Sequence, residues 1–126
     1  MNLLVDIIRT KGIQNIDVSM LDEENKKMML TEAGTILIRR GDCMKGVLAL
    51  NLARNTEKLV EVGNDFFEQR HFDLAVLAFE HTGKTEMLNR LGALCIEEEL
   101  YEYALKAFHA AGNSEMVDFV KKNFLD

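Results

Sequence analysis

Apolar residues recur at intervals of three and four along most of the chain, which is the spacing of one face of an α-helix. The clearest example lies between Thr85 and Gly112. Its first block contains Met87, Leu88, Leu91, Leu94 and Cys95, and its second contains Tyr101, Ala104, Leu105, Ala107 and Phe108. The acidic run 97–99 separates the blocks, and Gly112 follows the second, where glycine readily ends a helix in the left-handed conformation. The pattern predicts two helices joined by a turn.

This two-helix pattern recurs with a period of 29 residues. Residues 58–86 align with residues 87–115 without a gap, and eight positions are identical. The identical pairs are Leu59 with Leu88, Gly63 with Gly92, Glu68 with Glu97, Ala75 with Ala104, Ala78 with Ala107, Phe79 with Phe108, Gly83 with Gly112 and Glu86 with Glu115. A fixed period of this length is typical of stacked helical hairpins. We expect repeats over about 29–57, 58–86 and 87–115, and a half repeat over 116–126.

A glycine stands inside each predicted first helix, at Gly34, Gly63 and Gly92. Glycine in a helix interior costs about 1 kcal/mol relative to alanine. Its recurrence at one repeated position therefore predicts a gain in packing. We expect close approach of the second helix of each pair, at the facing positions Gly46, Ala75 and Ala104.

The first 27 residues lie outside the repeat and are predicted to form an N-terminal capping segment (1–27) on a helical-repeat domain (28–126), in a single domain overall. An apolar stripe predicts a short helix that ends near Lys11 and Gly12. Ser19 and Asp22 have the spacing of a capping box for a long helix that runs to about Arg40. An amphipathic anchor is the alternative, but a short stripe with almost no basic flank disfavours membrane binding.

Later helix starts carry Thr, Ser or Asn, which are residue types that favour the N-cap position. We expect Thr85 to cap the first helix of the third repeat, and Asn113 with Ser114 to cap the helix that follows.

The repeat resembles the tetratricopeptide repeat. That family has a small residue in its first helix, an aromatic residue at the start of the second, an alanine twelve residues after the glycine and an aromatic residue four further on. Two copies here match this spacing: Gly63, Phe72, Ala75, Phe79 and Gly92, Tyr101, Ala104, Phe108. The unit is shorter than the 34 residues of that family and lacks its early Trp and closing Pro. The alanine, aromatic, alanine-glycine endings are also similar to those of vesicle-coat and intraflagellar-transport scaffolds. The resemblance implies an all-α fold, a right-handed α-α superhelix of about three helix-turn-helix repeats plus N-terminal capping helices.

Composition agrees with a helical domain and narrows the class of partner. The 126-residue chain has no proline and a net charge of −6. Residues 58–126 hold seven basic and thirteen acidic side chains, which disfavours nucleic acid and favours a basic peptide or protein face. No apolar run is long enough for a membrane span, and the start does not read as a secretory signal. Two widely spaced cysteines are typical of buried, reduced thiols, so we expect a cytoplasmic protein.

Motifs for catalysis or metal binding are weak. Glu68 and His71 have the Glu-x-x-His spacing of di-iron bundles, but such sites need a second motif and two further carboxylates. The cysteines and histidines lack zinc-type spacing, and the chain has neither a phosphate-binding glycine loop nor a nucleophile elbow. The sequence therefore predicts that the protein is not an enzyme and that it binds neither a metal nor a cofactor.

The resemblance implies a binding groove along the first helices, at fixed offsets from the repeated glycines. Carried over position by position, it gives Thr35, Asn64 and Ala93, then Ile38, Phe67 and Ile96, then Arg39, Glu68 and Glu97. We expect an apolar row centred on Phe67 and flanked by acidic groups, which suits a peptide with a basic residue. The alternative is that Ile38, Phe67 and Ile96 pack between helices.

The leading functional hypothesis is a non-enzymatic protein-protein interaction module that binds a peptide or helix on the concave face of the scaffold. A second hypothesis is a structural subunit that self-associates or docks through the ends of the stack, because Phe119 and Phe124 lie in the half repeat. A third is a small helical ligand-binding protein or enzyme whose site has no recognisable motif.

Overall fold

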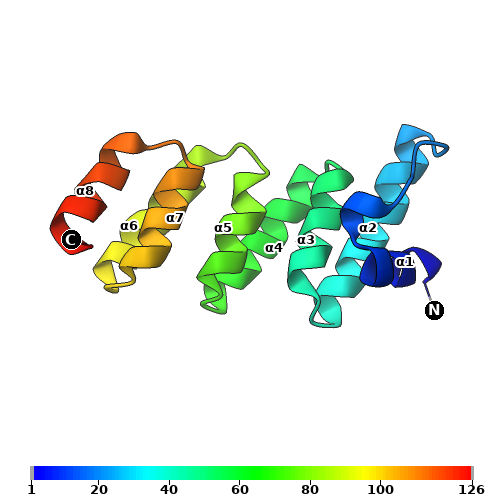
Figure 1. Cartoon of the computed structure of the whole chain (residues 1–126), viewed down its shortest axis with the longest axis horizontal. Coiled ribbons are helices and arrows are strands. Elements are labelled where there is room, and N and C mark those ends of the chain that lie inside the picture. The colour runs from blue at the N-terminus through cyan, green and yellow to red at the C-terminus, as the bar shows by residue number, and fades with distance from the viewer. Residues whose placement is uncertain (1, 126) are drawn as a thin grey trace. The chain divides into compact units, whose positions relative to one another are not determined.

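The computed structural model describes residues 2–125, and these contain helices and no strands, which confirms the all-α fold class (Figure 1). The elements are α1 (Leu3–Lys11), the short 3-10 turn η1 (Ile13–Asn15), α2 (Glu23–Arg39), α3 (Cys43–Leu52), α4 (Thr56–Glu68), α5 (Phe72–Glu80), α6 (Thr85–Glu97), α7 (Tyr101–Ala110) and α8 (Ser114–Phe124). Helices packed together are near neighbours in sequence, such as α2 with α3 and α6 with α7. Met1 and Asp126, the outer ends of the expected capping segment and half repeat, lie outside the described residues.

The chain divides into two compact units, and the boundary falls inside α4, between Leu59 and Val60. The first unit holds α1, α2, α3 and the start of α4. Its core includes Val5 and Ile8 of α1, which pack with Ala33, Leu37 and Ala49. Because α1 covers apolar side chains of α2 and α3, it shields them from water.

Residues with left-handed backbone conformation recur at the sequence period. Gly41, Arg70 and Glu99 follow the first helices of the three pairs, and Arg54, Gly83 and Gly112 follow the second helices, with φ between 56° and 95°. Within each set, successive residues are 29 positions apart. The backbone therefore turns at the same register position in each pair, as the sequence period predicts.

Close packing at the repeated glycines is confirmed, but its partner differs between the units. A Cβ atom on Gly34 would lie 2.9 Å from the carbonyl oxygen of Gly46, as expected. A Cβ on Gly63 would lie 2.5 Å from the Phe79 ring, and one on Gly92 would lie 2.6 Å from the Phe108 ring. In the second unit the nearest group is thus an aromatic ring rather than the expected alanines, because the ring extends from the next turn of the second helix into the space that glycine leaves.

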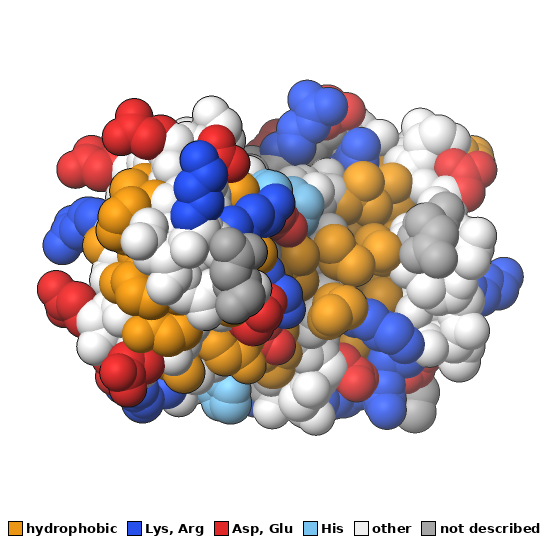
Figure 2. All heavy atoms as spheres, turned by 60° about the vertical axis from the view of Figure 1, so that its left-hand side comes forward, with side chains coloured by type: hydrophobic (Ala, Val, Ile, Leu, Met, Phe, Trp, Pro, Cys, Tyr) orange, Lys and Arg blue, Asp and Glu red, His pale blue; other side chains and the backbone are white. Residues whose placement is uncertain are grey.

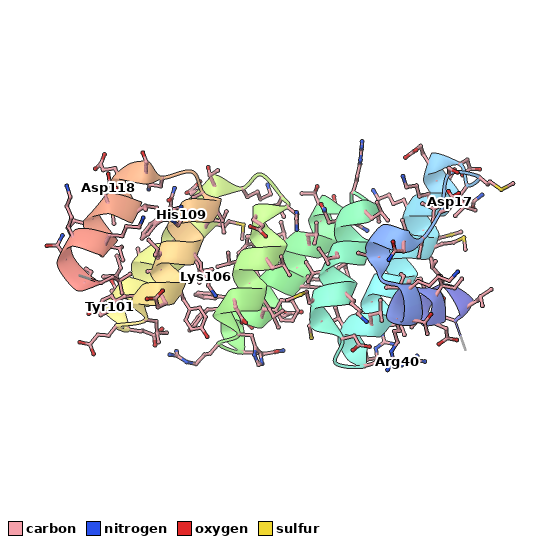
Figure 3. The ribbon with its side chains drawn as sticks, viewed as in Figure 1. Asp17, Arg40, Tyr101, Lys106, His109 and Asp118 are labelled. Atoms are coloured by element: carbon pink, nitrogen blue, oxygen red, sulfur yellow. The ribbon has the colours of Figure 1, made fainter. Side chains whose placement is uncertain are left out.

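Two predicted helix starts are wrong by a few residues. α2 begins at Glu23 with Asp22 as its N-cap, and the Asp22 carboxylate accepts a hydrogen bond from the backbone N–H of Asn25 at 2.7 Å. Ser19 instead donates its hydroxyl to Asp17 at 2.6 Å, within the loop before α2 (Figure 3). Asp22 therefore replaces Ser19 as the cap because only its carboxylate reaches the free N–H groups of the first turn.

The predicted cap of α6 also shifts by one residue. Thr85 is the first helical residue, and Lys84 occupies the N-cap position without a side-chain cap. Asn113 caps α8, as expected. The end of α1 at Lys11, followed by Gly12, is confirmed.

The substitution Gly92→Ala tests the packing of this glycine against the Phe108 ring. We expect the free energy of unfolding to fall by about 1–2 kcal/mol, because the clash with the buried Phe108 ring outweighs the better helix propensity of alanine. Chemical denaturation measures the change. In a Phe108→Leu background the added penalty of Gly92→Ala should shrink, and an unchanged penalty would show that the ring is not the obstacle.

Candidate functional site

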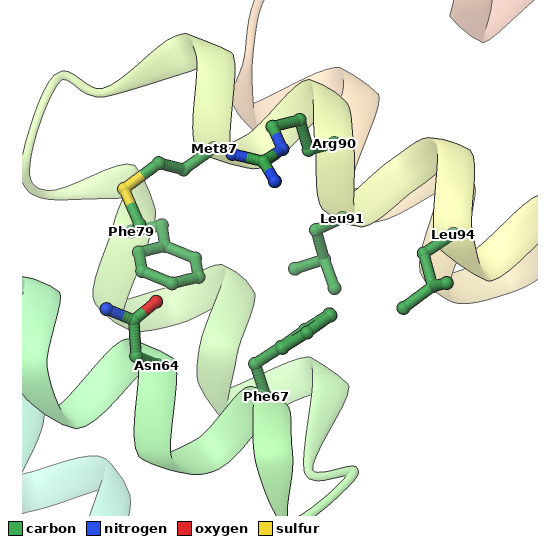
Figure 4. A pocket seen from close by; sticks show the side chains of 7 residues that line it. All are labelled: Asn64, Phe67, Phe79, Met87, Arg90, Leu91 and Leu94. Carbon is green, nitrogen blue, oxygen red and sulfur yellow. The ribbon is translucent and has the colours of Figure 1, made fainter.

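A surface pocket of about 280 Å³ lies in the second unit, where α4, α5 and α6 meet (Figure 4). The side chains that line it are Asn64, Phe67, Phe79, Met87, Arg90, Leu91 and Leu94. Five of these seven are apolar, while Asn64 supplies an amide and Arg90 a guanidinium. The pocket therefore offers an apolar surface with two polar groups at its sides.

Helical spacing explains how these residues meet. Asn64 and Phe67 are three residues apart and share a face of α4, while Met87, Leu91 and Leu94 follow one face of α6. Phe79 enters from α5 and is 3% exposed. Its ring reaches this position because Gly63 has no side chain to block it. The same contact that joins α4 to α5 therefore builds one wall of the pocket.

Aromatic contacts hold Phe67 in place beside the start of α5. Its ring meets that of Phe72 edge-on, with 6.0 Å between centroids. The guanidinium of Arg70 lies over the Phe72 ring at 5.2 Å and pairs with the Glu98 carboxylate at 2.6 Å. Edge-to-face aromatic pairs add about 0.5–1.5 kcal/mol beyond simple burial, so this chain of contacts restricts the position of the pocket wall.

Among residues 2–125 the side chain of Arg90 makes neither an ion pair nor a hydrogen bond, and it is exposed at the pocket. A guanidinium keeps its charge at any physiological pH and presents a planar fork of donors. The pocket therefore carries a positive charge with no protein carboxylate assigned to it within the described chain.

Only part of the groove expected from the tetratricopeptide resemblance lines this pocket. Asn64 and Phe67 do so, whereas Glu68, Ala93, Ile96 and Glu97 do not. Glu68, Ala93 and Glu97 are exposed, and Ile96 is half-buried. The acidic flank expected beside Phe67 is thus not part of the pocket, where Arg90 supplies the charge instead.

The other three expected groove residues lie in the first unit. Thr35 donates its hydroxyl to the backbone carbonyl of Thr31 at 2.8 Å. Ile38 packs where a Cβ on Gly46 would lie 2.5 Å from its side chain, which agrees with the alternative that it fills the space between α2 and α3. Arg39 is exposed and borders a separate polar hollow of about 370 Å³.

The pocket residues that lie on α6 are not among the groove positions expected from the sequence, although Met87, Leu91 and Leu94 belong to the apolar stripe that predicted this helix. Leu88 and Cys95 on this helix are buried, but Met87 and Leu94 are half-buried. One signal was present in the sequence: the stripe on α6 is wider than a single buried row needs. An apolar stripe that broad is consistent with a helix that faces both its pair and a neighbouring groove.

We call the loop from the second helix of one pair to the first helix that follows a corner; the three corners join α3 to α4, α5 to α6 and α7 to α8. At two of them an asparagine side chain makes two hydrogen bonds. Asn55 accepts from the backbone N–H of Lys58 at 3.1 Å and donates its amide to the Thr31 hydroxyl at 3.1 Å. Asn113 accepts from the N–H of Met116 at 3.2 Å and donates to the Asn89 side chain at 2.9 Å. Each asparagine thus caps its own first helix and binds the first helix of the preceding pair. The two arrangements are in the same register, 58 residues apart.

The corner between α5 and α6 lacks this arrangement. The register position of the asparagine is Lys84, and that of its acceptor is Val60. A lysine side chain cannot accept a hydrogen bond to cap the helix, and a valine side chain offers no acceptor. Val60 precedes Asn64 by one turn of α4, and Lys84 precedes Met87 by three residues. The pocket therefore adjoins the corner that has no asparagine link.

Thr82 changes the same corner further. At the two other corners, Asn55 and Asn113 also donate their backbone N–H groups to Leu50 and Phe108, which closes the preceding helix. Lys84 instead donates its backbone N–H to the Thr82 hydroxyl at 3.1 Å, and that hydroxyl donates to the carbonyl of Phe79 at 2.6 Å. The Phe79 carbonyl also accepts the backbone N–H of Thr82 at 3.0 Å, so both of its donors at this corner come from Thr82 rather than from the residue that precedes α6.

The thiols are not activated. Burial, together with the nearby Glu98 carboxylate, raises the pKa of Cys95 to about 11, while Arg70 opposes the rise. Burial also raises the pKa of Cys43, with help from Asp42. Both thiols are protonated at neutral pH, and a protonated thiol is a poor nucleophile.

The described residues contain no group of three histidine, cysteine, aspartate or glutamate side chains placed to hold a metal ion. None of the described helices is both long and apolar enough to cross a bilayer. Comparisons with models of known protein families, with characterised proteins and with solved structures give no match for this chain. The geometry of the pocket is therefore the basis for assigning a function.

The double substitution Lys84→Asn with Val60→Thr should rebuild the missing corner, with Thr in place of a valine of nearly the same shape. We expect the free energy of unfolding to rise by about 1–2 kcal/mol, from one N-cap and one side-chain hydrogen bond. Urea denaturation measures the change. Lys122→Asn removes the same charge from an exposed position on α8 and should change stability by less than about 0.5 kcal/mol. If Lys122→Asn stabilised the protein as much as the double variant, the gain would not come from a hydrogen-bonded link between α6 and α4.

Alkaline pH should destabilise the protein through Cys95. Between pH 9 and about pH 11 the unfolded thiol ionises while the native thiol keeps its proton, so the unfolded state is increasingly favoured. We expect the free energy of unfolding to fall more steeply across this range in the wild type than in Cys95→Ala. Parallel pH profiles for the two proteins would show that the thiol titrates normally when folded.

Proposed function

We propose that this chain is a non-enzymatic protein-interaction module whose second unit binds an apolar side chain of a partner peptide or helix in the pocket between α4, α5 and α6. The observation that carries the proposal is the pocket itself, which is apolar, open at the surface and walled by packed helices. Apolar grooves between helices commonly receive the apolar face of a partner helix.

The size of the pocket favours a side chain over a small molecule. Sites for small molecules usually enclose about 300–1,000 Å³ and bury most of the ligand. At about 280 Å³ and open to solvent, this pocket suits one or two side chains of a longer segment. Binding through so few anchors gives modest affinity, on the order of micromolar.

The charge at the pocket favours a partner with an acidic residue beside the apolar one. Arg90 is the charged residue among those that line the pocket, and a carboxylate pairs with a guanidinium through two parallel hydrogen bonds. The net charge of −6 opposes this at long range, but physiological salt screens charges beyond about 8 Å. The contact pair therefore dominates, and we propose an acidic rather than a basic partner segment.

The proposal extends to the architecture and location expected from the sequence. The left-handed residues at 29-residue spacing support a tetratricopeptide-like stack of helix pairs, for which we propose the right-handed superhelix of that family. The free cysteines Cys43 and Cys95 support a reducing compartment such as the cytoplasm.

A second candidate function is docking through α8. Phe119 and Phe124 on this helix are 46% and 38% exposed, and the Phe124 ring stacks on the Tyr101 ring with 4.3 Å between centroids. Figure 3 labels Tyr101, and Figure 2 shows apolar side chains among charged ones on the face that is turned forward. Lys121 stands at the register position of Gly34, Gly63 and Gly92. Because its side chain fills the space that a second helix would need, this face favours association with another protein surface over continuation of the stack.

Paired substitutions distinguish the two candidates. Phe67→Ala removes one pocket wall, whereas Phe119→Ala removes an aromatic ring of the same size from α8. In affinity capture with quantitative mass spectrometry, we expect Phe67→Ala to lower recovery of a set of partners about tenfold or more, since central aromatic anchors contribute about 2 kcal/mol or more. The same partners should remain bound to Phe119→Ala.

Circular dichroism and thermal unfolding of both variants control for loss of structure. Loss of partners from Phe119→Ala alone would favour docking through α8, and a strict monomer by light scattering would then exclude self-association. An identical partner set for wild type and Phe67→Ala would refute the pocket as the binding site.

A further inference from the structure

The register of the repeat allows the three corners of the fold to be compared atom by atom. The corners α3–α4, α5–α6 and α7–α8 place Asn55, Lys84 and Asn113 at the start of the next helix. The first backbone N–H that the asparagines cap belongs to Lys58 or Met116, and the equivalent N–H at the middle corner belongs to Met87. Differences among these three amides therefore report on the corner chemistry with little change in context.

Side-chain chemistry distinguishes the middle corner from the other two. Lys84 provides no side-chain cap, and the Met87 N–H donates instead to the backbone carbonyl of Lys84 at 3.1 Å. Val60 provides no acceptor for a link from α6 back to α4. The backbone N–H of Lys84 bonds to the Thr82 hydroxyl, within the same loop. The corner therefore lacks the side-chain link between successive pairs, and its absence lowers the free energy needed to separate the start of α6 from α4.

The weakened corner and the pocket share the same two helices. Val60 and Asn64 lie on successive turns of α4, and Lys84 and Met87 lie at the start of α6. Figure 4 shows the pocket between these helices, with Met87 and Arg90 on the α6 side and Asn64 and Phe67 on the α4 side. A displacement of the α6 start relative to α4 therefore changes the distance between the pocket walls.

The opposite end of α6 has a side-chain link that its start lacks. Glu98, which follows α6, pairs with Arg70 in the turn after α4. The backbone N–H of Leu100 also donates to the carbonyl of Cys95 at 2.7 Å, which closes the end of α6. We therefore expect a displacement of α6 relative to α4 to be larger at its start than at its end.

We propose that the α5–α6 corner is a hinge that sets the width of the pocket, with α6 pivoting about the contacts at its C-terminal end. The hinge itself follows from the hydrogen bonds and is independent of any ligand. The further statement that a bound side chain closes the hinge rests on the proposed function. A pocket of adjustable width would accept apolar side chains of different size.

Residue-resolved amide hydrogen exchange by NMR tests the hinge without a ligand. We expect the protection factor of the Met87 amide to be about tenfold lower than those of Lys58 and Met116. The Met87 N–H is bonded to the Lys84 carbonyl, but no side-chain link ties this turn to the preceding pair, so the turn opens more readily. Met116 lies in the last helix of the described chain, where fraying lowers protection. Fraying would therefore reduce the expected difference between Met87 and Met116. Equal protection at the three amides, or lower protection at Met116, would overturn the hinge.

Two variants confirm that the corner chemistry is the cause. Lys84→Asn with Val60→Thr should raise the protection of Met87 to that of Lys58 and Met116. Thr82→Ala, which supplies the alanine found at Ala53 and Ala111, removes the hydroxyl that accepts the Lys84 N–H. It should raise the protection part of the way, because this N–H is then available to the Phe79 carbonyl, as at the two other corners. Lys122→Asn should leave Met87 unchanged. If amide exchange at Met87 were no slower in either corner variant, the residues of the corner would not be the cause of its low protection.

The role of the hinge in binding has a separate readout. Once a partner segment is captured through Phe67, the double variant should narrow the range of apolar residues tolerated at the anchor position of a synthetic peptide series, as measured by fluorescence anisotropy. Unchanged tolerance with slowed exchange would mean that the corner moves but does not govern binding. Absence of any Phe67-dependent partner would refute the proposed function and leave the exchange result standing.

Discussion

The contact between a helical glycine and a phenylalanine ring is the constraint on which the second unit depends. At Gly63 and Gly92 an added Cβ would lie within 2.6 Å of the rings of Phe79 and Phe108. Each ring thus sits directly against the backbone of its partner helix, which fixes the separation of the pair. Interiors packed at this density cannot absorb even one methyl group without strain. The glycine that weakens each helix in isolation therefore determines how the two helices of a pair fit together.

The corners follow a different rule from the pairs. Within a pair, packing of apolar groups is repeated faithfully. Between pairs, asparagine links at Asn55 and Asn113 alternate with an unlinked corner at Lys84. Apolar packing within pairs and polar links between pairs can vary independently, because they use different residues. One junction can therefore lack its polar link while the helices on either side stay intact, and here that junction adjoins the apolar pocket.

The pocket is shaped both by the apolar packing within a pair and by the missing polar link between pairs. Phe79 reaches it because Gly63 leaves room, and its α6 wall begins at the corner where Lys84 replaces asparagine. The polar groups at its sides, Asn64 and Arg90, come from different helices, so their separation follows any movement between α4 and α6. The shape of the pocket thus depends on buried packing as well as on the side chains that face solvent.

Much of the local structure could be predicted from the sequence because its causes are local. The 29-residue period, the turns after Gly83 and Gly112 and the start of α7 at Tyr101 follow from helical spacing and from the conformational freedom of glycine. The N-cap positions at Asp22 and Lys84 differ from the expected Ser19 and Thr85. Ser19 and Asp22 both precede α2 and only Asp22 caps it, while α6 begins without any side-chain cap, so neither boundary follows from residue type alone.

Only the tertiary structure decided which side of α6 faces the pocket. Family offsets pointed to Ala93, Ile96 and Glu97, whereas Met87, Arg90, Leu91 and Leu94 line it. The rotation of a helix about its axis is set by the side chains it packs against, here the Phe108 ring on Gly92, and those lie elsewhere in the chain. The sequence by itself determined where helices begin, end and repeat, while the faces they present to a partner emerged only when the helices packed together.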